Sequence, residues 1–186
     1  MLSSGTNNNF GLDLAVIGNG RTAALLEPAS RLVWWCHPRF DGDPVFCRLL
    51  AGDEEKGFSD VVLDGMADFS SDYERNTAVV STVLTSNDSA SIRITDFAPR
   101  FRNYDRIFRP PQLVRIIEPI SGLPRITIRV RPTSNYGLPI TERSLGSNHI
   151  SFRGKDLVLR LTTDAPLAYI DREAPFVLTK PIHMVF

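Results

Sequence analysis

The stretch Arg31–Leu50, RLVWWCHPRFDGDPVFCRLL, contains both tryptophans and both cysteines of the chain. It opens with Leu32–Trp35, apolar and aromatic residues that fit the pleated, half-buried surface of a strand. The segment Val45–Leu50 follows Pro44, and a proline at the first helical position indicates one or two helical turns. Between the strand and the helical segment lies a loop with the side chains of His37, Arg39, Phe40, Asp41 and Asp43.

Two interpretations of this loop are open. In the first, it is a structural corner in which Arg39 and Asp41 bond to one another or to backbone, because most charged loop residues are simply solvated. In the second, it is a recognition or docking loop on a rigid strand. Asp41 and Asp43 lie too close in sequence to flank a glycosidic bond easily. Trp34 and Trp35 point to opposite faces of the strand, so one of them is expected in the core.

Outside this stretch, short segments of β-forming residues recur between turn residues. In Arg125–Arg131, the side chains of Ile126, Ile128 and Val130 share one face, as in a strand with one buried face. Leu113–Ile120 is apolar on both faces and is expected to be a central strand. The other predicted strands are 12–17, 22–26, 58–63, 69–75, 78–85, 91–97, 149–153, 157–163 and 167–170. The sequence therefore predicts an all-β fold, a mostly antiparallel β-sandwich with one short helical segment near residues 45–50.

Length and composition favour a single folded domain. The chain has 186 residues, of which 42% are hydrophobic, enough for a core of its own. Residues 1–11 are expected to be a mobile N-terminal arm, and the sandwich to span residues 12–186. The string Val16–Ala23, VIGNGRTA, matches a dinucleotide-binding fingerprint, but Pro28 arrives too soon for the helix that such a site requires. We interpret Gly18-Asn19-Gly20 as the turn of a hairpin.

Positive charge gathers in the second half of the chain. Residues 1–92 hold 13 acidic and 6 basic side chains, whereas residues 93–186 hold 8 acidic and 15 basic ones. The segment Ala98–Pro111, APRFRNYDRIFRPP, is predicted to be irregular and interleaves arginines with aromatic residues, as RNA-binding surfaces do. Because the net charge of the chain is zero, we expect this segment, with Arg100 and Arg102, to pack on a neighbouring domain and not on nucleic acid. Arginine supplies 18 of the 21 basic residues, which favours bidentate pairing with carboxylates.

The sequence lacks the patterns of a metal site, a cofactor site or a nucleophilic triad. Cys36, His37 and Cys47 do not have zinc-site spacing, and no serine stands in a G-x-S-x-G motif. We expect no cofactor, and we interpret both thiols as core packing. No apolar run is long enough to cross a bilayer, and the N-terminus does not resemble a signal peptide. Two cysteines fit a reducing compartment, so a cytoplasmic protein without a membrane partner is expected.

Several strings are similar to the N-terminal region of bacterial glycoside hydrolase family 15 proteins, the glucoamylase and trehalase-like enzymes. They are AVIGNGRTAALL, WWCHPRFDGDPVFCRLL, GDEEKGF, RITDFAPRF, QLVRIIEPISGLPRITIRVRPTSNYG, GSNHISFRG and LVLRLTTDAPLAYI. The resemblance extends over nearly the whole chain after the first dozen residues. It implies a supersandwich-like β-sandwich, which in such enzymes precedes a catalytic barrel of paired helices that holds both catalytic glutamates. No catalytic residue of the family is therefore assigned to this chain.

The resemblance implies a non-catalytic domain that packs on the catalytic (α/α) barrel of an α-glucoside hydrolase and borders its active-site approach. The candidate docking or sugar-proximal residues are Trp35, His37, Arg39, Asp41, Asp43, Arg100 and Arg102. The alternative is a carbohydrate-binding module for α-glucans or trehalose that uses Trp35, Arg39 and Asp41.

The last segment, Pro175–Phe186, is apolar and β-like. Similar N-terminal domains continue beyond such a point, so we expect the sandwich to be truncated at its C-terminal end, with the catalytic barrel absent from the chain. A missing strand leaves a sheet edge or an inner face uncovered, and such surfaces recruit other chains. A homo-oligomer formed through an exposed sheet edge or the docking face is therefore expected.

Overall fold

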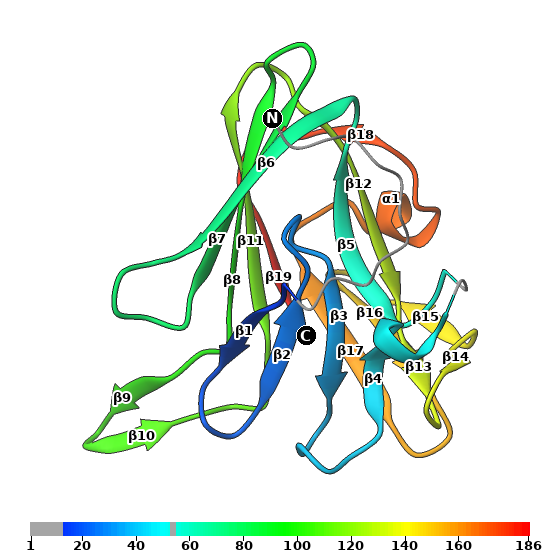
Figure 1. Ribbon diagram of the computed structural model, residues 1–186. Coiled ribbons are helices and arrows are strands. Elements are labelled where there is room, and N and C mark those ends of the chain that lie inside the picture. The colour runs from blue at the N-terminus through cyan, green and yellow to red at the C-terminus, as the bar shows by residue number, and fades with distance from the viewer. Residues whose placement is uncertain (1–12, 53–54) are drawn as a thin grey trace.

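The computed structural model describes residues 13–52 and 55–186. The mobile N-terminal segment predicted at residues 1–11 lies outside this range. Within it, antiparallel strands form two large sheets that face each other, as Figure 1 shows. The predicted all-β, mostly antiparallel sandwich is confirmed.

Sheet A contains the stretch around Trp34 and Trp35. Its strand order is β1-β2-β3-β5-β12-β18, and β4 pairs with β3. In β12 the predicted alternation is present, because Ile126, Ile128 and Val130 are buried. The bounds are β1 Ala15–Gly18, β2 Ala23–Leu26, β3 Leu32–Cys36, β4 Pro44–Cys47, β5 Phe58–Leu63, β12 Arg125–Arg131 and β18 Phe176–Val177.

Sheet B faces sheet A and has the order β15-β16-β17-β19-β11-β8-β7-β6. As its apolar sequence predicts, the segment at residues 114–121 is a central strand, β11, between β19 and β8. The bounds are β6 Met66–Tyr73, β7 Val80–Ser86, β8 Ser91–Phe97, β11 Val114–Ser121, β15 Arg143–Leu145, β16 His149–Arg153, β17 Val158–Thr163 and β19 Ile182–Val185.

Two small hairpins and two short helices complete the described part of the fold. The hairpins are β9 Phe101–Asn103 with β10 Arg106–Phe108, and β13 Thr133–Ser134 with β14 Leu138–Pro139. The helices are the 3-10 helix η1, Arg48–Leu50, and the α-helix α1, Leu167–Asp171.

Three local predictions are wrong. Residues 45–47 are not helical but belong to β4, because Phe46 and Cys47 pair with Trp35 and Trp34 of β3; only η1 remains of the predicted helix. Residues 167–170 form α1 and not a strand, since leucine and alanine after Pro166 favour a helix start. The segment predicted to be irregular at residues 98–111 contains the β9–β10 hairpin.

A buried ion pair in sheet B is hydrogen-bonded across the core to sheet A. The Nε of Arg115 donates to Asp96 Oδ1 at 2.7 Å within sheet B. Its Nη2 donates to the carbonyl of Ser30 at 2.6 Å and its Nη1 to the carbonyl of Ser59 at 3.3 Å, both on the side of sheet A. Arg115 and Asp96 are only 2% and 3% exposed. Their charges are tolerated because they pair with each other and because the carbonyls of Ser30 and Ser59 accept hydrogen bonds from Arg115.

Arginine–carboxylate pairs also cover the outer face of sheet A. The guanidiniums of Arg31, Arg129 and Arg131 lie 4.8, 5.0 and 5.3 Å from the centre of the Phe58 ring. Arg129 makes a bidentate pair with Asp60, and Arg131 makes one with Glu173. The predicted use of arginine for bidentate pairing is confirmed, and these pairs bury an aromatic ring on a face outside the main core.

The segment at residues 175–186 occupies the interior of sheet B. β19 lies between β17 and β11, and the Phe186 ring packs edge-on against Phe46 of sheet A at 5.6 Å. Both sheets combine strands of the acidic and the basic half of the chain, since β5 pairs with β12 and β7 pairs with β8. The opposite charges of the two halves therefore lie within one body.

Candidate functional site

Three segments project from one end of the sandwich, at the bottom of Figure 1, and two of them contain or adjoin predicted site residues. They are the turn between β1 and β2, the loop between β3 and β4, and the β9–β10 hairpin. We call residues 101–108 the arm and this end of the sandwich the loop end. The fold thus brings the Arg39 loop and the arm to the same end.

The β3–β4 loop presents an arginine–carboxylate pair to solvent. The Nε and Nη2 of Arg39 donate to Asp41 at 2.8 and 3.0 Å, as the sequence predicts, and the two side chains are 76% and 71% exposed. The hydrogen bond from Arg39 lowers the pKa of Asp41, which keeps this carboxylate ionised. Asp43 accepts hydrogen bonds from the backbone N–H groups of Asn135 and Tyr136, and it thereby ties the loop to the β13–β14 turn.

Trp35 and His37 face inward and not toward a ligand. Trp35 is fully buried, and its Nε1 donates to Thr22 Oγ1 at 2.7 Å. Its ring therefore offers no face to a sugar, which removes it from the predicted sugar-proximal set. The ring of His37 lies 4.8 Å from that of Trp35. Burial lowers the pKa of His37, and its Nδ1 has no hydrogen-bond partner among the described residues.

Neither cysteine has the surroundings of a reactive thiol. Both are free, and burial raises the pKa of Cys36 and of Cys47 above 9.0, so little thiolate forms near neutral pH. The Sγ of Cys47 lies 3.0 Å from Thr133 Oγ1. In residues 13–52 and 55–186, no group of His, Cys, Asp and Glu is arranged to hold a metal ion, and no helix is long and apolar enough to cross a membrane.

The false dinucleotide motif places a buried asparagine at the base of the arm. The Nδ2 of Asn19 donates to the carbonyl of Pro99 at 2.9 Å and to that of Pro110 at 2.8 Å. Its Oδ1 accepts hydrogen bonds from the backbone N–H groups of Arg21 and Thr22. Asn19 is 3% exposed, so one side chain joins the β1–β2 turn to both ends of the segment that carries the arm.

The arm itself is a two-stranded hairpin with exposed aromatic side chains. Phe101 and Phe108 stack with ring centres 5.6 Å apart, and each is at least two-fifths exposed. Tyr104, at the tip, is 92% exposed. Arg102 bonds Asp105 at 2.7 Å, and Arg100 precedes β9. The predicted mixture of arginine and aromatic side chains is therefore displayed on a regular hairpin.

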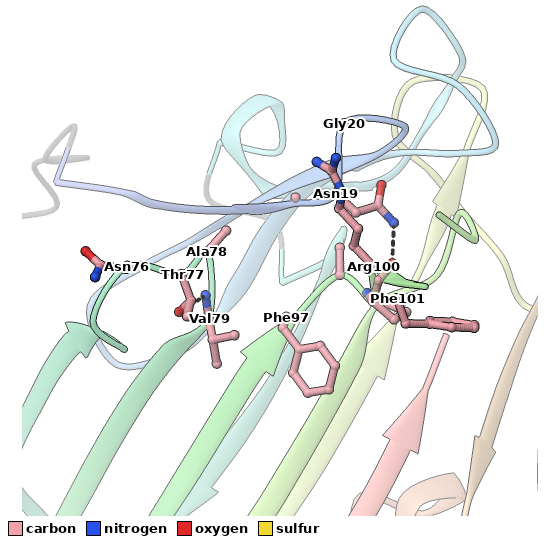
Figure 2. A pocket seen from close by; sticks show the side chains of 12 residues that line it. Asn19, Gly20, Asn76, Thr77, Ala78, Val79, Phe97, Arg100 and Phe101 are labelled. Carbon is pink, nitrogen blue, oxygen red and sulfur yellow. Dashed lines mark hydrogen bonds between the residues drawn. The ribbon is translucent and has the colours of Figure 1, made fainter. Parts of the chain in front are cut away.

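An open pocket of about 730 Å³ lies between the base of the arm and two turns. Its walls are residues 18–20 of the β1–β2 turn, residues 76–79 of the β6–β7 turn and residues 97–101. In Figure 2, Arg100 extends toward Gly20 on one wall, Asn76 lies on the opposite side, and Phe97 lies between them. Of the predicted site residues, only Arg100 lines this pocket.

Sequence reasoning missed three residues that position the loop end or the core: Asn19, Asp96 and Arg115. Asn19 was visible only as a turn residue, since its partners Pro99 and Pro110 lie 80 and 91 residues away. Asp96 and Arg115 stand in two strings that carry the family resemblance, but nothing local marks them as partners.

Comparison with known proteins gives a consistent result. A family model described as "Trehalase-like, N-terminal" matches residues 7–163. A protein named trehalase from Thermoplasma volcanium is 35% identical over 138 residues, which cover 68% of this chain and 20% of that protein. A trehalase from Thermoplasma acidophilum is 33% identical over 115 residues, 60% of this chain and 19% of that protein.

The chain thus spans about a fifth of the length of these curated relatives. No solved structure matches it. The family model covers most of the residues that build both sheets, and we conclude that the chain belongs to the trehalase-like N-terminal family.

Proposed function

We propose that this chain is the non-catalytic N-terminal domain of a trehalase-type glycosidase and that it packs on the catalytic domain of that enzyme. The observation that carries the proposal is the family match at residues 7–163, together with trehalases five times as long as the matched region. The proposed partner is a barrel of paired helices of the glycoside hydrolase family 15 type. The proposed substrate of the whole enzyme is trehalose or another α-glucoside.

Within the loop end, the loop between β3 and β4 is the surface that we assign to this packing. Arg39, Phe40 and Asp41 face solvent there, and the loop is fixed by the bonds of Asp43 to a second turn. Exposed side chains on a rigid support are typical of recognition loops. In this role the Arg39–Asp41 pair borders the approach to the active site of the catalytic domain, and the pair adds little to the stability of the fold because both side chains are solvated.

The carboxylates of the loop end are not arranged for glycoside hydrolysis. Such catalysis requires two carboxyl groups across the glycosidic bond, one of which is protonated to act as an acid. Asp41 is engaged by Arg39, with a lowered pKa, and Asp43 by two backbone N–H groups. We therefore expect the purified chain to release no glucose from trehalose or maltose. Glucose release that disappears in an Asp41→Asn variant contradicts this assignment.

The docking role is tested in a polypeptide that joins this domain to a trehalase catalytic domain. Arg39→Ala is expected to lower kcat/KM while it leaves the melting temperature of the isolated domain nearly unchanged. Arg93→Ala, at an exposed position of β8, is the matched control. Equal losses of activity and melting temperature in the Arg39 variant return the loop to a purely structural role.

A second candidate function, carbohydrate binding, is favoured by the pocket at the base of the arm. Arg100 and Asn76 offer hydrogen-bond donors and Phe101 a half-exposed ring, groups that suit a hydroxyl-rich ligand. Titration of the chain with trehalose and maltose by calorimetry tests it. Binding that is lost in Arg100→Ala but kept in Arg93→Ala supports this candidate, and no heat at millimolar sugar removes it.

A further inference from the structure

Two of the unpaired strand edges in the described fold carry opposite charges. β6 pairs only with β7, at the edge of sheet B, and β10 pairs only with β9 of the arm. Residues 64–74 hold Asp64, Asp68, Asp72 and Glu74 and no basic residue, whereas residues 100–109 hold four arginines and one aspartate. An exposed edge of unpaired N–H and C=O groups is a template for another strand.

The face of each β6 side chain follows from its pairing with β7. Phe69 and Tyr73 lie opposite the buried residues Leu84 and Val80, so both share the core-facing side of the sheet. Both nevertheless remain 44% exposed. Asp68 and Asp72 point to the other side. Since Glu74 N–H bonds the carbonyl of Val79, the alternation of the ladder directs the backbone groups of residues 69, 71 and 73 to the free edge. The N–H group of Tyr73 donates there to Asp72 Oδ1 at 2.7 Å, so the groups of Phe69 and Ser71 are the ones that a new strand can bond.

The same argument applied to the arm identifies the matching residue. Tyr104 and Asp105 both have positive φ, 46° and 60°, as in the two-residue turn of a tight hairpin. Asn103 and Arg106 flank this turn and form its hydrogen-bonded pair, so the backbone of Ile107 faces the free edge of β10. Ile107 is 58% exposed. A two-stranded hairpin alone is marginally stable in water, and a third strand paired with it would stabilise it.

We propose that β10 of one copy pairs antiparallel with β6 of a second copy, with Ile107 opposite Ser71. In this register the Ile107 side chain lies between Phe69 and Tyr73, and Arg106 lies directly opposite Asp72. In Figure 1, β6 runs from the top toward the left, and the turn that follows it lies above the arm, with residues 76–79 and 97–101 around one pocket. In the proposed dimer, a two-fold axis relates the two copies, so that each copy makes both contacts. This inference does not depend on the function proposed above.

The charge complementarity provides a test by exchange of signs. Asp72→Arg places an arginine opposite Arg106 of the partner copy, and Arg106→Asp places an aspartate opposite Asp72 of the partner copy. We expect wild-type protein to have about twice its mass of 20.8 kDa in light scattering at about 100 μM. Each variant alone is expected to raise the dissociation constant of the dimer by about tenfold or more, because like charges face each other at two sites. An equimolar mixture of the two variants restores the dimer.

Two further variants separate association from folding. Ser71→Pro removes an N–H group that points away from β7, so it blocks the free edge without loss of a backbone ladder bond. It also removes the hydrogen bond between Ser71 Oγ and Thr82 Oγ1, so Ser71→Ala is measured beside it, and Ser71→Pro is expected to give a folded monomer where Ser71→Ala stays dimeric. Arg93→Asp, an exposed charge reversal on β8, leaves the dimer intact. If the wild-type protein is a monomer at about 100 μM, the proposal is wrong, and the arm is then assigned to contact with the catalytic domain. Folded Asp72→Arg and Arg106→Asp variants that stay monomeric when mixed, or a dimeric Ser71→Pro, overturn it as well.

Discussion

In the buried Arg115–Asp96 pair, substitution of one partner is expected to lower the stability of the fold. Asp96 is the partner of Arg115, and it also accepts a hydrogen bond from the hydroxyl of Ser30. Removal of one partner of a buried pair leaves an uncompensated charge in a medium of low polarity. The contacts among β8, β11 and the β2–β3 turn therefore require both the Asp96 carboxylate and the Arg115 guanidinium.

Asp96→Asn is therefore expected to lower the free energy of unfolding by about 3–5 kcal/mol. Urea denaturation followed by tryptophan fluorescence measures the change, since Trp35 lies in the same core. Asp64→Asn, which removes an exposed partner of Arg125, is the control and is expected to change stability little. A similar small effect of both substitutions contradicts the role assigned to the core pair.

His37 gives the stability of the fold a dependence on pH. Burial lowers its pKa below 6.5, so the unfolded chain takes up a proton at this residue before the folded chain does. The free energy of unfolding therefore falls as pH decreases below 6.5. His37→Gln is expected to lose less stability than the wild type between about pH 7.5 and about pH 5.5. His149→Gln is the matched control, and identical pH profiles of wild type and His37→Gln rule the effect out.

Among single residues, hydrogen-bonded partners that are close in the sequence could be predicted, whereas partners that are far apart in the sequence were missed. The Arg39–Asp41 pair spans two residues, and a loop offers few other partners for either side chain. The expectation that one tryptophan is core follows from strand alternation, and Trp35 is that residue. The partners of Asn19 and Arg115 come from other elements, so only the tertiary fold identifies them.

Among the elements, the arm depends on a hydrogen-bonded clamp at its base. Asn19 alone bonds the carbonyls on both sides of the arm, at Pro99 and Pro110. We expect Asn19→Ala to reduce the free energy of unfolding by about 1–3 kcal/mol, because two partly buried carbonyls lose their donor. Hydrogen exchange at residues 101–108 is expected to accelerate more than exchange in sheet B. Asn103→Ala, within the arm, is the control, and equal acceleration in all elements contradicts the clamp.

Strands in which apolar and polar residues alternate could be predicted from the sequence. Segments whose structure is decided by pairing with another strand could not. β12 alternates buried side chains with exposed or half-buried ones over its whole length, and Ser91–Phe97 and His149–Arg153 are strands at the predicted residues. Residues 45–47 have an apolar sequence that suits a helix or a strand, and their pairing with Trp34 and Trp35 decides for the strand. The arm was missed because alternation over three residues is too short to detect.

For the whole molecule, sheet B depends on a strand outside the region matched by the family model. The match to the family model ends at residue 163, whereas β19, Ile182–Val185, lies between β17 and β11 and pairs with both. A chain cut after Thr163 leaves two strand edges facing a gap and exposes the inner residues Ile117 and Leu161. We expect residues 1–163 to lose cooperative unfolding and near-ultraviolet circular dichroism, and to scatter light at micromolar concentration. A melting temperature equal to that of the full 186-residue chain shows that β19 is dispensable.

The interior position of β19 also affects the order of events during protein synthesis. β11 ends at Ser121, and its neighbour β19 begins about 60 residues later. A ribosome that adds about 5–20 residues per second needs roughly 3–12 s to reach the missing strand. Throughout this interval the nascent chain holds an incomplete sheet, so its exposed strands are available to chaperones or to neighbouring nascent chains on the same messenger RNA.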